Sequence, residues 1–268
     1  MATKLKPDAI TADDIKSYLA TQDDFALEIR VKRAAEQLRF SVEHGGTYRD
    51  PHTDKPRQFD LRVQTGDVGR QVILAIECKC LQPNFPLLIS RIGRTAEEGY
   101  HQLIQMQSLG LPPGPVRPGL RREMYRSREP VGKAATQVGI HAREGTWVDG
   151  DGDTYEKWSQ ALQSAAVIAQ QAMRGEKGPR ITAIIPVLVV SNGTLWVVDY
   201  DVDGNTPAAP VNMDEATLYV DHKVDISVPH DAAMTFSLTH LSIFTEGGIA
   251  AFMHDLANRG IRFDALFD

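Results

Sequence analysis

A short hydrophobic segment that ends in charged residues constrains this chain more than any other feature. Residues 71–76 read QVILAI and are followed directly by Glu77, Cys78 and Lys79. A run of aliphatic and β-branched residues is typical of a strand that is buried on both faces of a sheet. A carboxylate and an ammonium group at the end of such a strand need compensating partners. We therefore expect other polar groups to converge there.

A neighbouring strand is predicted upstream. Residues 57–63 alternate polar and apolar side chains, as a half-buried strand does. Residues 65–70 carry two glycines and an aspartate, a composition that favours a turn. An antiparallel hairpin of this kind brings Asp60 beside Glu77.

Side-chain alternation along the buried strand sorts its last residues between the two faces of the sheet. Glu77 and Lys79 are expected on one face, and Cys78 and Cys80 on the other. These two cysteines are the only ones in the chain, and two positions on one strand face suit a disulfide poorly, so reduced thiols are expected. With Asp60 from the adjacent strand, two acids and one lysine should therefore meet.

The spacing of these groups resembles the PD-(D/E)XK nuclease superfamily, also called restriction-endonuclease-like. Asp60 is followed, after sixteen residues, by Glu77-Cys78-Lys79, and Phe59 stands where the family pattern has a nominal proline. By motif, the resemblance covers roughly residues 20–100. It implies an α/β fold with a restriction-endonuclease-like core of one helix, a three-stranded antiparallel meander, a second helix and further strands. Helices then lie on both faces of a mixed sheet.

The resemblance also implies an activity and a metal. The expected function is metal-dependent hydrolysis of phosphodiester bonds, by a DNA endonuclease of the restriction, repair or defence type; RNA is not excluded as substrate. Mg²⁺ is the expected cofactor, and Mn²⁺ is expected to substitute for it. The implied metal ligands are Asp60, Glu77, the main-chain carbonyl of Cys78 and Glu28, because the family often places an additional acid on its first helix. Lys79 would hold or help to deprotonate the attacking water.

Two alternatives stay open at this point. The first is a nuclease-fold binding module within a larger complex, which keeps the acids without useful turnover. The second is an α/β protein of unrelated function in which Asp60, Glu77 and Lys79 never meet. If the three residues do meet, the alternative to a nuclease site is a buried ion-pair network without chemistry, although such a network is a poor source of stability. For Glu28, pairing with Lys32 one helical turn later is an equally good interpretation.

Charge is distributed unevenly along the chain. The net charge is −6, from 29 basic and 35 acidic residues, which argues against a general nucleic-acid coat. Residues 114–143, however, hold seven basic and two acidic residues. Contacts to nucleic-acid phosphates are predicted at Arg91, Arg94, Arg121, Arg122 and Arg126, with a solvent-exposed loop or helix face as the alternative for this Arg-rich stretch.

The chain is expected to form one restriction-endonuclease-like domain over residues 1–268. An irregular Arg-rich insertion is expected at about 110–150 and an acidic C-terminal extension from about 201. The expected helices cover 25–38, 95–108, 155–173 and 246–258, and the expected later strands cover 181–190, 195–198, 216–220 and 238–243.

Other classes of protein are disfavoured. No apolar run approaches the roughly 18 residues that a membrane span needs, and no secretory signal is visible, so a soluble cytoplasmic protein is expected. Residues 149–153 (DGDGD) lack the glycine that an EF-hand loop requires at its sixth position. There is no phosphate-binding loop and no nucleophile elbow. A homodimer and partner proteins of a defence or repair system remain possible.

Overall fold

The computed structural model describes residues 8–20, 23–50, 53–67, 69–105, 113–117, 125, 129–141, 144–150, 152–174, 181–227 and 233–267. Its helices are α1 (Ala12–Leu19), α2 (Asp24–Gln37), α3 (Gly152–Met173), α4 (Glu246–Ala257) and α5 (Ile261–Ala265). In this part of the chain, no helix combines the length and the hydrophobicity that crossing a membrane would require.

The strands begin with β1 (Ser41–His44), β2 (Thr47–Arg49), β3 (Pro56–Gln58), β4 (Leu61–Gly66), β5 (Arg70–Lys79), β6 (Leu87–Gly93), β7 (Leu103–Gln105) and β8 (Gly114–Val116). They continue with β9 (Pro130–Ile140), β10 (Trp147–Gly150), β11 (Ile181–Val190), β12 (Leu195–Asp199), β13 (Val211–Asn212), β14 (Glu215–Ser227) and β15 (Ala233–Thr245).

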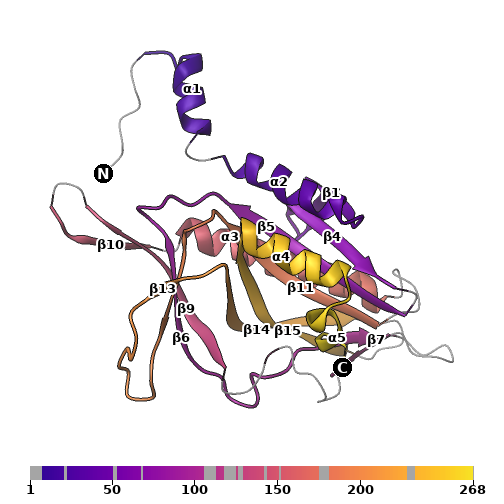
Figure 1. Ribbon diagram of the computed structural model, residues 1–268. Helices are drawn as coiled ribbons and strands as arrows, with labels where there is room; N and C mark the ends of the chain where they lie inside the picture. The colour runs from indigo at the N-terminus through magenta and orange to yellow at the C-terminus, as the bar shows by residue number, and fades with distance from the viewer. Residues whose placement is uncertain are drawn as a thin grey trace.

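The strands form one large mixed sheet and one small hairpin of β2 and β3. The main path of the large sheet runs β1-β4-β5-β11-β15-β14-β9-β6-β12-β13 (Figure 1). The first three strands pair antiparallel, and β11 then pairs parallel with both β5 and β15. The protein is therefore an α/β protein with a mixed sheet, as predicted.

Strand β5 lies inside the sheet because both of its faces are apolar. Val72, Leu74 and Ile76 belong to a cluster with α2, α4 and α5, whereas Ile73 and Ala75 face α3 on the other side. Helices thus cover both faces of β5, which explains why its sequence is continuously hydrophobic rather than alternating.

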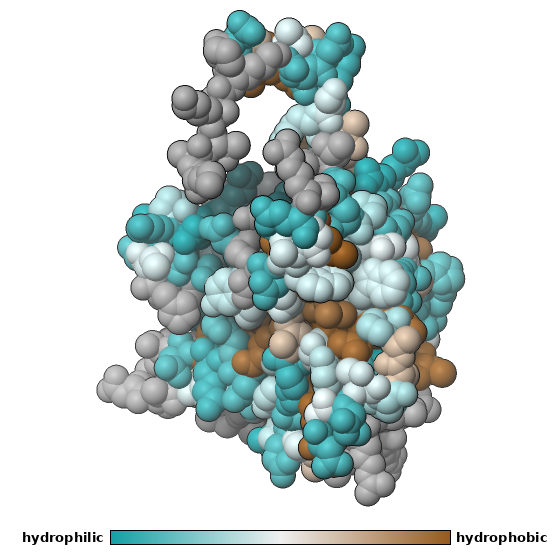
Figure 2. All heavy atoms as spheres, turned by 90° about the vertical axis from the view of Figure 1, so that its left-hand side faces the viewer, coloured by the Kyte–Doolittle hydropathy of each residue, from teal (hydrophilic) through white to brown (hydrophobic). Residues whose placement is uncertain are grey.

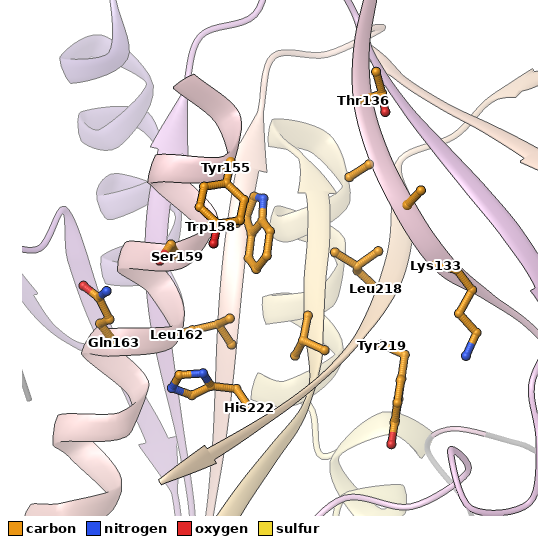
Figure 3. A pocket seen from close by; sticks show the side chains of 13 residues that line it. Lys133, Thr136, Tyr155, Trp158, Ser159, Leu162, Gln163, Leu218, Tyr219 and His222 are labelled. Carbon is orange, nitrogen blue, oxygen red and sulfur yellow. The ribbon is translucent and has the colours of Figure 1, made fainter. Parts of the chain in front are cut away.

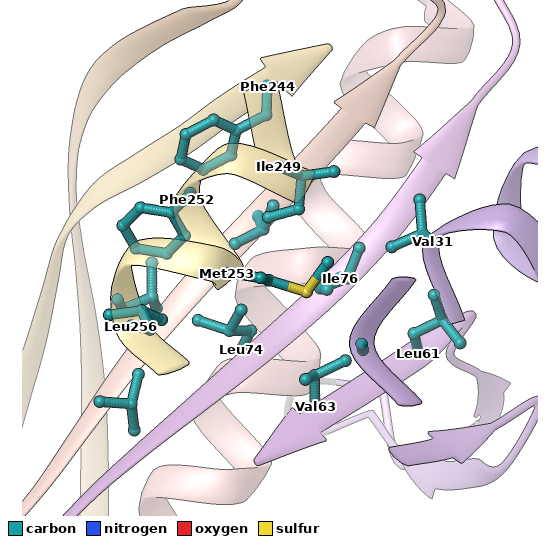
Figure 4. Packing of buried hydrophobic residues seen from close by; sticks show 14 of the residues in the cluster. Val31, Leu61, Val63, Leu74, Ile76, Phe244, Ile249, Phe252, Met253 and Leu256 are labelled. Atoms are coloured by element: carbon teal, nitrogen blue, oxygen red, sulfur yellow. The ribbon is translucent and has the colours of Figure 1, made fainter. Parts of the chain in front are cut away.

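The cluster around α2 and α4 anchors this half of the sheet (Figure 4). Helix α4 contributes Ile249, Phe252 and Met253, which pack towards Leu74 and Ile76 of β5. All five side chains are at most 1 % exposed. Truncating one such side chain to alanine typically lowers the unfolding free energy by about 2–5 kcal/mol. These contacts therefore hold α4 firmly against β5.

Several expected elements differ in the structure. The segment predicted to be helical over 95–108 contains no helix among its described residues, and Leu103–Gln105 forms strand β7 instead, because it pairs antiparallel with β11 and β8. The region 110–150, expected to be irregular, contributes β9 to the main sheet and β10 paired to it. From residue 201 onwards, β14 and β15 also join the main sheet, with β15 directly beside β11.

The predicted strand 57–63 is divided in two. Pro56–Gln58 pairs with β2, and Leu61–Gly66 pairs with β5. Asp60 lies between the two pieces, immediately before β4. Asp60 is therefore not paired in either strand, and its side chain reaches the end of β5.

Helix α1 differs from the other helices in having no buried residue. It begins with a capping box of Thr11 and Asp14 and lies apart from the sheet in Figure 1. Figure 2 shows the side of the molecule that faces left in Figure 1, where hydrophilic side chains cover much of the surface and hydrophobic ones gather near its centre.

Candidate functional site

Asp60 and Glu77 meet at the end of β5, as the hairpin predicted. Leu61 pairs with Ile76 in the β4–β5 register, so the residue before β4 lies opposite the end of β5. The backbone N–H of Cys78 donates to Asp60 Oδ2 at 2.8 Å, and the N–H of Asp60 lies 3.4 Å from Glu77 Oε1. The two acids are therefore fixed through backbone hydrogen bonds on neighbouring strands.

Glu77 is fully buried, with 0 % of its surface exposed. Burial and the nearby charge of Asp60 raise the pKa of Glu77 to about 9. Its carboxyl group is therefore protonated at neutral pH unless a cation offsets the cost of ionisation. Buried carboxyl groups with a strongly raised pKa are common at ligand-binding and catalytic sites, and structural ion-pair networks also contain them.

Lys157 of α3 supplies the cation that faces this pair. Its ammonium nitrogen lies 2.9 Å from Asp60 Oδ2, 3.2 Å from Asp60 Oδ1 and 3.5 Å from Glu77 Oε2. Burial lowers the pKa of Lys157, but the charges of Asp60 and Glu77 outweigh this effect and raise the pKa above its ordinary value. The lysine therefore stays charged and neutralises Asp60, while Glu77 keeps its proton at neutral pH.

Lys79, the lysine predicted to join the acids, points to a different partner. Its ammonium group lies 3.4 Å from Asp24 Oδ2, in the first turn of α2. The other Asp24 oxygen accepts a 2.6 Å hydrogen bond from the backbone N–H of Cys80. Asp24 thus ties the end of β5 to the start of α2 and holds Lys79 at the edge of the site.

Glu28 lies on α2, near the acid pair. Its Oε2 is 3.0 Å from Nε2 of His44, at the end of β1. Burial, followed by the charge of Asp60, raises the pKa of Glu28, which means that the two carboxylates are close enough to repel each other. The predicted pairing with Lys32 is not formed, because Lys32 bonds Glu36 instead.

A metal ion at this site would need oxygen ligands from the acid pair. Among the described residues, no group of three or more His, Cys, Asp or Glu side chains is arranged to hold a metal ion. Two carboxyl groups nevertheless converge on one point, and the ammonium group of Lys157 occupies it. Mg²⁺ needs only one or two protein carboxylates when substrate oxygens and water complete its coordination. A divalent cation at this point would therefore depend on such oxygens and on displacement of Lys157.

Two of the five arginines predicted to contact phosphates, Arg91 and Arg94, lie among the described residues. Arg91 forms a two-pronged ion pair with Asp199, at 2.7 and 3.0 Å, and Arg94 is only 6 % exposed, with its guanidinium 5.3 Å from the ring centre of Tyr125. These surroundings are those of structural arginines. Arg121, Arg122 and Arg126 lie outside the described residues.

Two residues of this site were not found by sequence reasoning: Lys157 and Asp24. Helix α3 was predicted, but the sequence gives no signal that its Lys157 would reach residues some hundred positions upstream. Asp24 lies one position before the helix expected over residues 25–38. Both cysteines are free thiols, as predicted.

Comparisons with protein-family models, with curated proteins and with solved structures found no match to this chain.

Proposed function

We propose that this protein is a metal-dependent nuclease that hydrolyses phosphodiester bonds, and that it is a DNA endonuclease of the restriction, repair or defence type. The observation that carries the proposal is the meeting of Asp60 and Glu77 at the end of a buried strand, with a cationic group across both. Two clustered carboxyl groups of this kind are the usual protein contribution to a Mg²⁺ site that acts on phosphates.

The order of elements supports the proposal. Along the chain, α2 is followed by the antiparallel strands β1, β4 and β5, and then, after an insertion, by α3 and the parallel strand β11. A restriction-endonuclease-like core has the same sequence of helix, three-stranded meander, helix and strand. The candidate acids occupy the positions that the resemblance assigns to them, before the second strand and at the end of the third.

A divalent cation would be held by Asp60 and Glu77, with the carbonyl of Cys78 and with Glu28 as further oxygen donors. When bound, such an ion lowers the pKa of a water molecule and offsets the charge that develops on the phosphate. Glu77 must give up its proton to serve as a ligand, because only the carboxylate binds a metal. Backbone hydrogen bonds hold Asp60 in position meanwhile.

Two lysines are available to the reaction. Lys157 occupies the point between the acids, so it must withdraw when another cation enters, since like charges repel strongly at such distances. Its ammonium group would then lie beside the scissile phosphate and stabilise the charge of the transition state. Lys79, whose ammonium group contacts Asp24, would orient the attacking water.

One observation favours the alternative of an inert nuclease-fold module that binds nucleic acid or a partner protein. Lys157 neutralises Asp60 without any metal, so the acids and the lysine can form a self-contained network. A protein with such a network would have the same fold but would not hydrolyse phosphodiester bonds. Cleavage of nucleic acid therefore distinguishes the nuclease from the inert module.

Incubation of supercoiled plasmid with the purified protein tests the proposal. We expect nicked and linear products with Mg²⁺ or Mn²⁺, and none with a chelator or with the Asp60→Asn variant. Binding of the plasmid without any cutting, under every metal condition, would refute the nuclease and leave the inert module.

A further inference from the structure

A groove lies beside α3, on the flank opposite to the candidate site. Its volume is about 660 Å³, and its walls are formed by α3 on one side and by β14 and β9 on the other (Figure 3). From α3, Tyr155, Trp158 and Leu162 project towards β14, and Leu218 lies on the opposite wall. His222 closes one end, next to Leu162.

The side chains of the groove match a flat ring with a polar edge. The Tyr155 and Trp158 rings meet edge to face, with their centres 4.7 Å apart, and Tyr155 is 52 % exposed, so one aromatic face is open to a ligand. Ser159 and Gln163 add hydroxyl and amide groups on the same wall. None of the described residues that line the groove is acidic, in a chain that carries 35 acidic residues.

A phosphate group suits this groove less well than a base does. Lys133 lines it, but in Figure 3 its side chain points away from α3, and it forms an ion pair with Glu98. A wholly apolar ligand would leave the amide and hydroxyl groups of the α3 wall without partners. Aromatic side chains with neighbouring hydrogen-bonding groups are the usual means of holding unpaired bases.

Helix α3 separates the groove from the candidate site. Tyr155 and Trp158 lie close to Lys157 in the sequence, yet Lys157 faces Asp60, whereas the two aromatic residues line the groove. The two sides of the helix are about one helix diameter apart, roughly 10–12 Å. An unpaired strand of several nucleotides that passes around α3 would therefore contact both.

We propose that this groove binds the bases of an unpaired stretch of nucleic acid, next to the strand that is held at Asp60 and Lys157. The inference rests on the proposed nuclease function and specifies its substrate: a single strand, or a duplex with unpaired nucleotides. In an intact duplex the bases are stacked inside, where Tyr155 and Trp158 cannot reach them. The groove thus distinguishes unpaired from paired substrate.

Tryptophan fluorescence provides the test. The chain has three tryptophans, so Trp147→Phe with Trp196→Phe leaves Trp158 as the sole reporter. This protein is titrated, with a chelator present to prevent cutting, with a single-stranded oligothymidylate and with a blunt duplex of equal length. Binding is followed by the quenching of Trp158 fluorescence. We expect the single strand to bind at least tenfold more tightly than the duplex. Plasmid nicking is measured in parallel with metal.

A matched pair of variants localises the binding. Tyr155→Ala should weaken the single-strand complex roughly 5- to 150-fold, the range found for loss of one stacking contact. Tyr200→Ala removes the same kind of aromatic ring, 37 % exposed, from a position that does not line the groove, and it should have no effect. Thermal unfolding is the check that both variants are folded. Ser159→Phe should fill the groove and therefore also weaken binding of the single strand.

Each outcome separates this inference from the nuclease proposal. Plasmid nicking without quenching by the single strand would overturn the groove assignment alone. Equal quenching by single strand and duplex, or equal loss in Tyr155→Ala and Tyr200→Ala, would also overturn it. Quenching that responds to Tyr155→Ala, but without nicking under any metal condition, would support the groove and refute the nuclease.

Discussion

The ammonium group of Lys157 lies 2.9 Å from Asp60 Oδ2 and 3.5 Å from Glu77 Oε2, so one cation from α3 contacts an acid immediately before β4 and an acid at the end of β5. This ammonium group compensates the negative charge of the buried site in the folded chain. Under the proposed function, a divalent cation would be held at the same point, so Lys157 would link the stability of the site to its chemistry.

Removing the negative charge of Asp60 should sharply reduce cutting. Asp60→Asn keeps the shape of the side chain and an oxygen to accept from the Cys78 N–H, but it removes the charge that a cation requires. We expect plasmid nicking to fall by at least about 100-fold, comparable to the loss of a key electrostatic group. Cooperative thermal unfolding should persist, and a variant that retains nicking would remove Asp60 from the proposed metal site.

The two lysines should behave differently in the absence of metal. Lys157→Met leaves Asp60 with an uncompensated charge, so we expect a loss of unfolding free energy on the order of 2 kcal/mol after allowing for partial exposure. Millimolar Mg²⁺ should restore much of this loss, because a ligand that binds only the folded state stabilises it. Lys79→Ala breaks a partly exposed pair with Asp24 and should cost less than about 1 kcal/mol.

Chemical denaturation with and without Mg²⁺ measures both effects. If Lys79→Ala proved the more damaging variant, or if Mg²⁺ failed to stabilise Lys157→Met, the position assigned to Lys157 would be wrong.

The buried carboxyl group of Glu77 should make stability depend on pH. Its pKa rises from 4.5 to about 9 on folding, so the folded protein keeps a proton that the unfolded chain releases. Stability from this group is present below pH 4.5 and is lost as the pH rises towards 9. Glu77→Gln cannot ionise, so its melting temperature relative to the natural protein should increase from pH 5 to pH 9 in chelator.

The control for this experiment is a substitution that changes no ionisable group, Gln37→Ala on the exposed surface of α2, where the difference in melting temperature should stay nearly constant with pH. A constant difference for Glu77→Gln as well would mean that Glu77 is ionised in the folded protein.

Binding of DNA should depend on the Arg-rich stretch rather than on the arginines that the structure pairs. Arg121→Ala combined with Arg122→Ala should weaken binding and reduce the slope of log K against log salt by roughly 1.8, because each phosphate contact contributes about 0.9. Arg91→Ala should leave the slope unchanged, since Asp199 already holds that side chain. Filter binding over a series of salt concentrations measures the slopes, and a reduced slope for Arg91→Ala alone would reverse the assignment.

The part of the site that depends on local pattern was predictable from the sequence. The hydrophobic run of β5, the turn after β4 and the alternation between them place Asp60 beside Glu77, and the register confirms it. The partners of the lysines were not predictable, because they depend on how α2 and α3 pack on the sheet. Lys79 contacts Asp24, and Lys157 contacts Asp60 and Glu77. Short-range spacing in the sequence does not predict this pairing.

The fold shows the same division. Strands with long apolar runs, such as Ile181–Val190, were identified correctly. Leu103–Gln105, in contrast, was expected to be helical, and its strand conformation comes from pairing with β11. Tertiary hydrogen bonding overrides local preference in such short segments.

Calorimetric titration with Mn²⁺ tests the central claim most directly, because it does not depend on choosing the right nucleic acid. We predict that the natural chain takes up a divalent cation, with release of the Glu77 proton near neutral pH, and that the Asp60→Asn variant takes up none. Identical heats for the two proteins, or no uptake by either, would contradict the account.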